Sequence, residues 1–178
     1  MEVRDGKMKD FFDAYQQKLG IEVTGNSIVF QVKGSNDGNI KAITEYVRVT
    51  INTEIGNEED YGKIIENDIT KAELNVINND FKNNCNYQLN AIGIKILKWD
   101  GTSLVTINGQ TALKVSYIRD AHPTTPENQK SPVIVNVYYF MNGDRKHSLT
   151  VSYRESEAGK WKSFLDKIVS SFTITEIN

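Results

Sequence analysis

The chain has 178 residues, of which 39% are hydrophobic and 25% charged, and a formal net charge of −2 at pH 7; this composition is typical of one globular domain with its own core. A nucleic-acid-binding protein would show a basic excess or a basic run, and the sequence has neither. It also lacks the roughly 20 consecutive apolar residues of a transmembrane helix, and its single cysteine, Cys85, excludes an internal disulfide and a cysteine-based metal cluster.

The first 25 residues are predicted to form an amphipathic helix and its connection, and residues 26–178 a single α+β domain. Gly20 stands where this N-terminal helix would end. The segment 1–10 is polar and contains no secretory signal, which leaves a cytoplasmic protein or an envelope protein whose signal has been removed. The apolar residues of the helix share one face: Met8, Phe11, Phe12, Tyr15 and Leu19.

Residues 21–92 show strand patterns first and a helical pattern afterwards. A strand or short hairpin is predicted over 21–32, and the alternation over 43–51 indicates a half-buried strand. Asn57 precedes three acidic residues, which is typical of a helix N-terminus. Residues 58–92 are therefore predicted to form one long helix, or two helices joined near residues 68–70.

From Ile94 the period of the pattern changes to two, and turn signals separate short strands. Strands are predicted over 94–97 and 104–107 on either side of an Asp100-Gly101 turn. Asn108-Gly109 then predicts a hairpin into the next strand.

The last third of the chain is predicted to hold a loop, two strands and a helix. All three prolines lie in 121–132, which indicates an exposed loop. The run 133–141 is apolar on both faces, as in a central strand, and an Asn142-Gly143 turn leads to its neighbour. Helical spacing predicts a helix over 161–172, followed by a short strand over 173–177. Hairpin turns join these strands, so the fold class is α+β, a largely antiparallel sheet packed against helices.

The second half of the chain resembles the Mog1/PsbP-like family of α+β domains. The resemblance covers roughly residues 40–175 and rests on element order and on short matches. It implies a Mog1/PsbP-like fold and a non-enzymatic binding or accessory protein, bacterial, that acts through a protein partner in a chaperone-, immunity- or envelope-accessory-like role. The family's lipoprotein-like members favour the envelope over the cytoplasm. No shared catalytic motif can be carried over, and the N-terminal helix departs from the family pattern. The matching segments are Ile107-Asn108-Gly109, Ala112-Leu113, Tyr117-Ile118-Arg119, residues 133–140 and 147–154, and Trp161 with residues 168–174.

No catalytic residue, metal site or cofactor is predicted. His147 and Ser148 are neighbours in a strand and point to opposite faces, so they cannot form a nucleophile–base pair. The loop 35–40 places Lys33 and Thr44 where a calcium loop needs acidic ligands. Cys85 lies on the apolar face of a predicted helix, as a small hydrophobe does, and no glycine-rich phosphate loop is present.

One set of polar side chains is a candidate binding surface. If the strands are neighbours, their non-apolar sides give one sheet face rich in tyrosine and arginine, which are common in binding hot spots. The alternative is a plain solvated sheet face. A different hypothesis, a small-molecule-binding or hydrolytic domain, requires a concave pocket between the sheet and a helix with convergent polar groups. A pocket that holds His147 within hydrogen-bond reach of a carboxylate would favour its hydrolytic form. The candidate binding residues are Tyr46, Arg48, Lys114, Tyr138 and Arg154.

Overall fold

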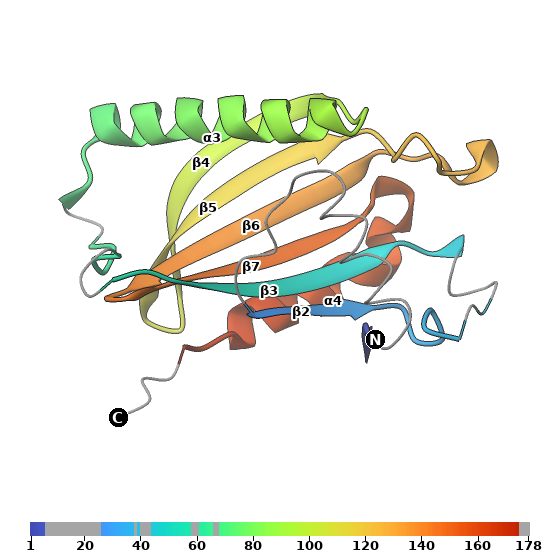
Figure 1. The fold of residues 1–178 in the computed structure, drawn as a ribbon, viewed down its shortest axis with the longest axis horizontal. Helices are drawn as coiled ribbons and strands as arrows, with labels where there is room; N and C mark the ends of the chain where they lie inside the picture. The colour runs from blue at the N-terminus through green and yellow to red at the C-terminus, as the bar shows by residue number, and fades with distance from the viewer. Residues whose placement is uncertain (6–25, 38, 40–43, 58–60, 66–67, 175–178) are drawn as a thin grey trace.

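The computed structural model describes residues 1–5, 26–37, 39, 44–57, 61–65 and 68–174 (Figure 1). The described residues form a seven-stranded sheet in the order β1-β2-β3-β7-β6-β5-β4. Every neighbouring pair is antiparallel. The strands are β1 (Glu2–Val3), β2 (Asn26–Gln31), β3 (Val47–Ile55), β4 (Ile96–Ile107), β5 (Gln110–Arg119), β6 (Val133–Asn142) and β7 (Arg145–Arg154), and the helices are α3 (Lys71–Ala91) and α4 (Ala158–Ser171).

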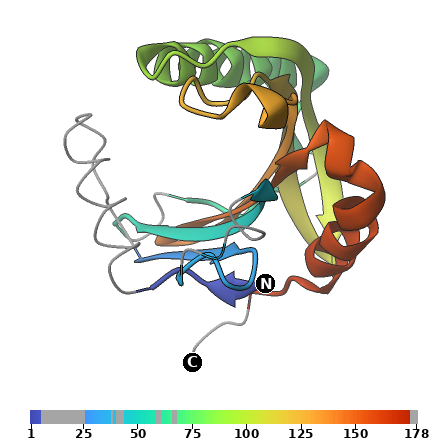
Figure 2. The same ribbon diagram turned by 90° about the vertical axis from the view of Figure 1, so that its right-hand side faces the viewer.

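The sheet is bent, and its two helices lie on opposite faces (Figure 2). We call these the α3 face and the α4 face. On the α4 face, Leu165 of α4 is buried against a core that includes Phe140 and Leu149. On the α3 face, Phe81 and Cys85 pack against a second cluster of valines and Tyr117. This arrangement confirms the predicted α+β fold with an antiparallel sheet packed against helices.

The predictions of turns at Asn108-Gly109 and Asn142-Gly143, of a central strand and of a C-terminal helix are confirmed, the helix being α4. Asn108 and Gly109 both have positive φ, 47° and 74°, and join β4 to β5, as a tight two-residue hairpin requires. Gly143, with φ 66°, lies in the connection between β6 and β7. β6 lies between β5 and β7 and has buried side chains on both faces, as a central strand does. The prolines lie in the segment between β5 and β6, which contains one short 3₁₀ helix, Glu127–Gln129.

The predicted helix over 58–92 is wrong in its first part. Residues 61–65 are not helical, and Tyr61 instead forms an isolated bridge with Gly143, its N–H donating to the Gly143 carbonyl at 2.8 Å. The helix begins after Thr70, whose hydroxyl accepts from the Glu73 N–H while the Glu73 carboxylate accepts from the Thr70 N–H. This reciprocal capping box is a stronger signal for a helix start than the acidic run at 58–60. It lies near residues 68–70, where the sequence also allowed a junction between two helices.

Three predictions about strands are also corrected. Asp100-Gly101 is not a turn, because β4 runs through it as a single strand with register shifts against β5. β3 covers residues 47–55 rather than 43–51, since β7 offers pairing partners as far as Ile55↔Arg145. Residues 173 and 174 are not in a strand, and the rest of the predicted C-terminal strand lies outside the described residues.

The predicted N-terminal helix lies in residues 6–25, outside the described residues. Glu2 and Val3, which precede it, form β1 and pair with Gln31 and Phe30 of β2. The Glu2 carboxylate accepts from the Gly34 and Asn36 N–H groups, both at 2.8 Å. The start of the chain is thus part of the sheet, and the division at residue 25 stays a prediction.

Candidate functional site

The structure places the predicted binding residues on two opposite faces of the sheet. Register decides this division: Ser152 pairs with Arg48 on one side and with Val135 on the other. Side chains of paired residues point to the same face, so Tyr46, Arg48 and Arg154 belong to the α3 face. Asn136 pairs with Val151 and Ser116, so Lys114 and Tyr138, which lie in the same alternation, belong to the α4 face.

The physical reason is that the apolar pattern changes face across the sheet. β3 and β7 bury their valines and leucine toward α4, whereas β5 buries Val115 and Tyr117 toward α3. β6, between them, buries side chains on both faces. The polar sides of β3 and β7 therefore lie on the α3 face, and the polar side of β5 lies on the α4 face. The five predicted residues do not form one surface.

Tyr46, Arg48, Arg119 and Ser152 come together on the α3 face, and we call them the arginine–tyrosine cluster. The Arg48 and Arg119 guanidinium carbons lie 5.6 and 5.8 Å from the centre of the Tyr46 ring. Arg119 Nη2 donates to the Tyr46 hydroxyl at 3.1 Å, and the Ser152 hydroxyl lies 3.3 Å from that same oxygen. These distances bring three strands, β3, β5 and β7, to one polar site.

The cluster carries an excess of positive charge that acts on Tyr46. Burial alone raises the pKa of the Tyr46 hydroxyl, but the charges of Arg48 and Arg119 and hydrogen bonds from Ser152 and Arg119 outweigh burial. The net result is a pKa lowered from 10.0 to about 8. Neither arginine has a carboxylate within ion-pair distance among the residues that the structure describes. The two guanidinium charges beside the hydroxyl favour its ionised form, and this lowers the pKa.

Glu157 fixes the backbone that carries Tyr46. Its carboxylate accepts from the Tyr46 N–H at 3.0 Å, from Trp161 Nε1 at 3.2 Å and from Arg154 Nη1 at 3.3 Å. Arg154 also donates to the Thr44 carbonyl and is only 8% exposed. Of the predicted binding residues, Arg154 therefore supports the cluster from within the protein.

A line of polar side chains continues from the cluster along β3 and β7, and we call it the polar track. The track consists of cross-strand pairs whose members are half-buried, except for the buried Ser152. It ends at an ion pair in which Lys146 Nζ lies 2.6 Å from Glu54 Oε2. Tyr61 donates to the other oxygen of Glu54 at 2.6 Å. The track consists of Arg48↔Ser152, Thr50↔Thr150, Asn52↔Ser148 and Glu54↔Lys146.

Lys114 and Tyr138 make a separate contact on the α4 face. The Lys114 amine lies 5.8 Å from the centre of the Tyr138 ring. Tyr138 is 9% exposed and belongs to the core beneath α4, and burial raises the pKa of its hydroxyl. This pair is better described as packing at the edge of the core than as part of the cluster.

Arg119 was not among the predicted binding residues, although the cluster depends on it. Its position in β5 continues the apolar alternation of Val115 and Tyr117, so the pattern assigned that side to the core. The available signal was the arginine itself, a charged residue at the end of an apolar strand face. Such a residue indicates where a core face meets an accessible site.

The two histidines lie apart from any catalytic arrangement in the described residues. His147 Nδ1 is 3.0 Å from the Thr53 hydroxyl, and burial, followed by the charge of Arg145, lowers the pKa of its imidazole. His122 contacts Thr124 within the proline-containing loop. Cys85 is half-buried, and burial raises the pKa of its thiol, which disfavours the reactive thiolate.

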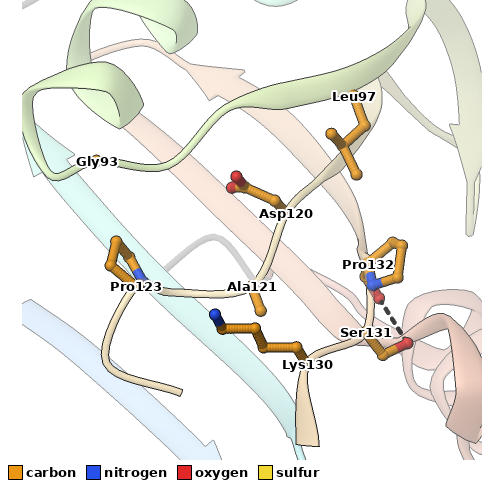
Figure 3. A pocket seen from close by; sticks show the side chains of 8 residues that line it. All are labelled: Gly93, Leu97, Asp120, Ala121, Pro123, Lys130, Ser131 and Pro132. Atoms are coloured by element: carbon orange, nitrogen blue, oxygen red, sulfur yellow. Dashed lines mark hydrogen bonds between the residues drawn. The ribbon is translucent and has the colours of Figure 1, made fainter. Parts of the chain in front are cut away.

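Among the recesses formed by described residues, two lie near the ends of the sheet, and neither of these is lined by a histidine. The larger, about 390 Å³, is formed by the start of β4 and by the residues flanking the loop between β5 and β6 (Figure 3). Its charged groups are already engaged: Asp120 accepts from the Lys95 N–H at 2.7 Å, and Lys130 pairs with Glu127 at 2.6 Å. The smaller, about 290 Å³, lies beside the β4–β5 hairpin. Neither provides the histidine and carboxylate that the hydrolytic hypothesis requires.

Within the described part of the chain, no group of three or more histidine, cysteine, aspartate or glutamate side chains is arranged to hold a metal ion. The same residues include no helix that is long and apolar enough to cross a membrane.

Comparison with known proteins finds similarity among solved structures. No protein-family model matches the chain, and no curated protein matches it. The structure is similar to cyanobacterial PsbP (CyanoP) from Synechocystis sp. PCC 6803, at 15% identity over 84% of this chain and 82% of that chain, with a TM-score of 0.48. It is also similar to PA94, a protein of unknown function from Pseudomonas aeruginosa, at 10% identity over 86% and 85% of the chains and a TM-score of 0.48.

Proposed function

We propose that this chain is a non-enzymatic binding or accessory protein that acts through a protein partner. The partner's contact surface on this chain is the arginine–tyrosine cluster together with the adjoining polar track. The observation that carries the proposal is the pair of guanidinium groups, Arg48 and Arg119, which the described residues leave without a carboxylate.

The shape and chemistry of this surface suit a protein partner. From Arg48 to Glu54 the polar track covers six residue steps along a strand, about 20 Å. Tyrosine and arginine provide large contact areas and fixed hydrogen-bond donors, which is why they dominate binding hot spots. A sheet holds both residues on a rigid support, so little conformational entropy is lost when they are covered.

The positive charge of this surface is concentrated at one end, in the arginine–tyrosine cluster. The whole chain has a net charge of −2, yet the cluster concentrates two arginines at one end of the track, while Glu54 and Lys146 neutralise each other at the other end. A partner that presents an acidic patch would be oriented by this difference.

The test is affinity capture from the source organism with the wild type and an Arg48→Glu/Arg119→Glu variant. A Lys82→Glu/Lys167→Glu variant makes the same change in charge at exposed positions of α3 and α4 and serves as the control. We expect one protein to be captured by the wild type and the control and lost with the cluster variant. With that protein purified, the dissociation constant should rise at least about tenfold for the cluster variant, equivalent to about 1.4 kcal/mol.

Circular dichroism and thermal unfolding must show that both variants are folded. Capture of the same protein with equal affinity by all three forms would place the contact elsewhere. If the wild type captures no protein, the proposal of a protein partner is wrong.

A further inference from the structure

The two arginines of the cluster retain hydrogen-bond donors that the described residues do not use. A guanidinium group has five N–H donors. Arg119 donates from Nη2 to the Tyr46 hydroxyl and from Nη1 to the Asp120 carbonyl at 2.9 Å. The Arg48 guanidinium lies over the Tyr46 ring. Arg48 makes no side-chain hydrogen bond to another described residue. Donors of both arginines therefore remain available beside a tyrosine hydroxyl.

The other buried arginine of this region shows how such a group is usually satisfied. Arg154 pairs with Glu157 and donates to the Thr44 carbonyl. The Glu157 carboxylate also accepts from the Tyr46 N–H and from Trp161, so it does not pair with Arg48 or Arg119. The cluster thus contains two arginines, and the described residues around it supply no carboxylate to pair with them.

We propose that Arg48, Arg119 and the Tyr46 hydroxyl form a binding site for one oxyanion group, a carboxylate or a phosphate. Guanidinium groups bind both through parallel N–H···O bonds, and a tyrosine hydroxyl adds a further donor. All three side chains are half-buried, which strengthens their attraction for an anion compared with exposed arginines. The inference rests on the proposed function in one respect: the partner's anchoring group would be an acidic or phosphorylated side chain.

The electrostatics of Tyr46 agree with this geometry and supply a readout. The uncompensated arginines hold the pKa of its hydroxyl at about 8. A bound oxyanion would cancel part of that positive charge, so the pKa should rise toward 10. Tyr46 therefore reports occupancy of the site without any knowledge of the natural ligand.

The experiment is a spectrophotometric pH titration of tyrosinate absorbance in the full chain. The protein has eight tyrosines, so Tyr46→Phe identifies the contribution of Tyr46. Titrations are run in sodium chloride, sodium acetate and sodium phosphate at one ionic strength. We expect a single tyrosine to ionise near pH 8 in chloride, to be absent from Tyr46→Phe, and to move upward by at least about half a pH unit in acetate or phosphate.

The two anions distinguish the sources of the oxyanion. A shift in acetate alone indicates a carboxylate, a shift in phosphate alone indicates a phosphate group, and a shift in both indicates a site for either. No shift in either anion overturns the proposal, and so does an equal shift in chloride when its concentration is varied. As a second measurement, calorimetry should show at least about tenfold weaker anion binding for Arg48→Gln/Arg119→Gln than for the wild type. Lys114→Gln, on the opposite face, is the control and should bind as the wild type does.

Failure of this proposal can be separated from failure of the proposed function. If oxyanions bind at the cluster but protein capture does not depend on it, the site stands and its ligand is not a protein. If a partner depends on the cluster while acetate and phosphate do not bind, the protein-binding surface stands and the oxyanion site is wrong.

Discussion

At the residue scale, Glu157 connects three parts of the protein. Its half-buried carboxylate accepts hydrogen bonds from the backbone before β3, from the end of β7 and from α4. Such an acceptor is costly to remove, because each donor loses its partner in a place that water reaches poorly. Glu157 also orients Tyr46, so the stability of the fold and the geometry of the cluster share one residue.

Glu157→Ala should lower the free energy of unfolding by about 2–4 kcal/mol, since it leaves Arg154 without its counter-ion and two further donors without an acceptor. Urea denaturation measures the change. Glu155→Ala is the matched control, because Glu155 is exposed, and it should change stability by less than about 0.5 kcal/mol. Equal effects of the two substitutions would show that the three hydrogen bonds add nothing.

At the scale of elements, the irregularity in β4 couples that strand to α3. Asn78 Oδ1 of α3 accepts from Trp99 Nε1 at 2.9 Å and from the Thr102 N–H at 3.0 Å. Gly101 lies between these donors with φ 108°, in the region that favours glycine. The glycine that suggested a turn instead lies at a register shift between β4 and β5, within one continuous strand.

Gly101→Ala should destabilise the protein by about 1–3 kcal/mol, because a side chain is strained at this φ. Steric contact adds little, since the new Cβ would lie 3.5 Å from Asn78 Oδ1, an ordinary van der Waals distance. Gly159→Ala provides the comparison. Gly159 lies in α4, where a Cβ would meet no atom within 4 Å, and alanine favours helix, so stability should stay equal or rise by up to about 1 kcal/mol. Thermal unfolding distinguishes the two, and equal Tm values would contradict the strain at Gly101.

At the scale of the whole molecule, one sheet carries a core on each face. Leu165 of α4 is 1% exposed and packs in the core with Phe140 and Leu149. Its neighbour Phe164 is 44% exposed. α3 has no fully buried residue, so the core beneath α4 is the better packed of the two and is expected to dominate global stability.

Leu165→Ala should therefore reduce the free energy of unfolding by about 2–5 kcal/mol through lost burial and the cavity that remains. Phe164→Ala removes a larger but partly exposed side chain from the same helix and should cost less than about 1.5 kcal/mol. Chemical denaturation followed by tryptophan fluorescence and by circular dichroism gives both values. A larger loss for Phe164→Ala would contradict the assignment of the core.

The sequence by itself determined what depends on neighbours along the chain. The Asn108-Gly109 hairpin follows from backbone conformations that few residue pairs adopt, and helix α4 follows from the spacing of Trp161, Leu165 and Ile168. The central position of β6 follows from apolar residues on both of its sides. Each of these features is determined by residues close together in the sequence, and for that reason each could be predicted.

Only the tertiary structure decided which polar sides share a face. Alternation divides each strand into two sides, but it does not say which side of the next strand lies beside it. The register between β3 and β7 set Arg48 beside Ser152. The registers of β6 with β7 and with β5 placed Tyr138 and its partner Lys114 on the α4 face. It also brought Arg119, on an apolar side of β5, to Tyr46 across the strands between them. The cluster depends on contacts between residues far apart in the chain, and no local pattern encodes such contacts.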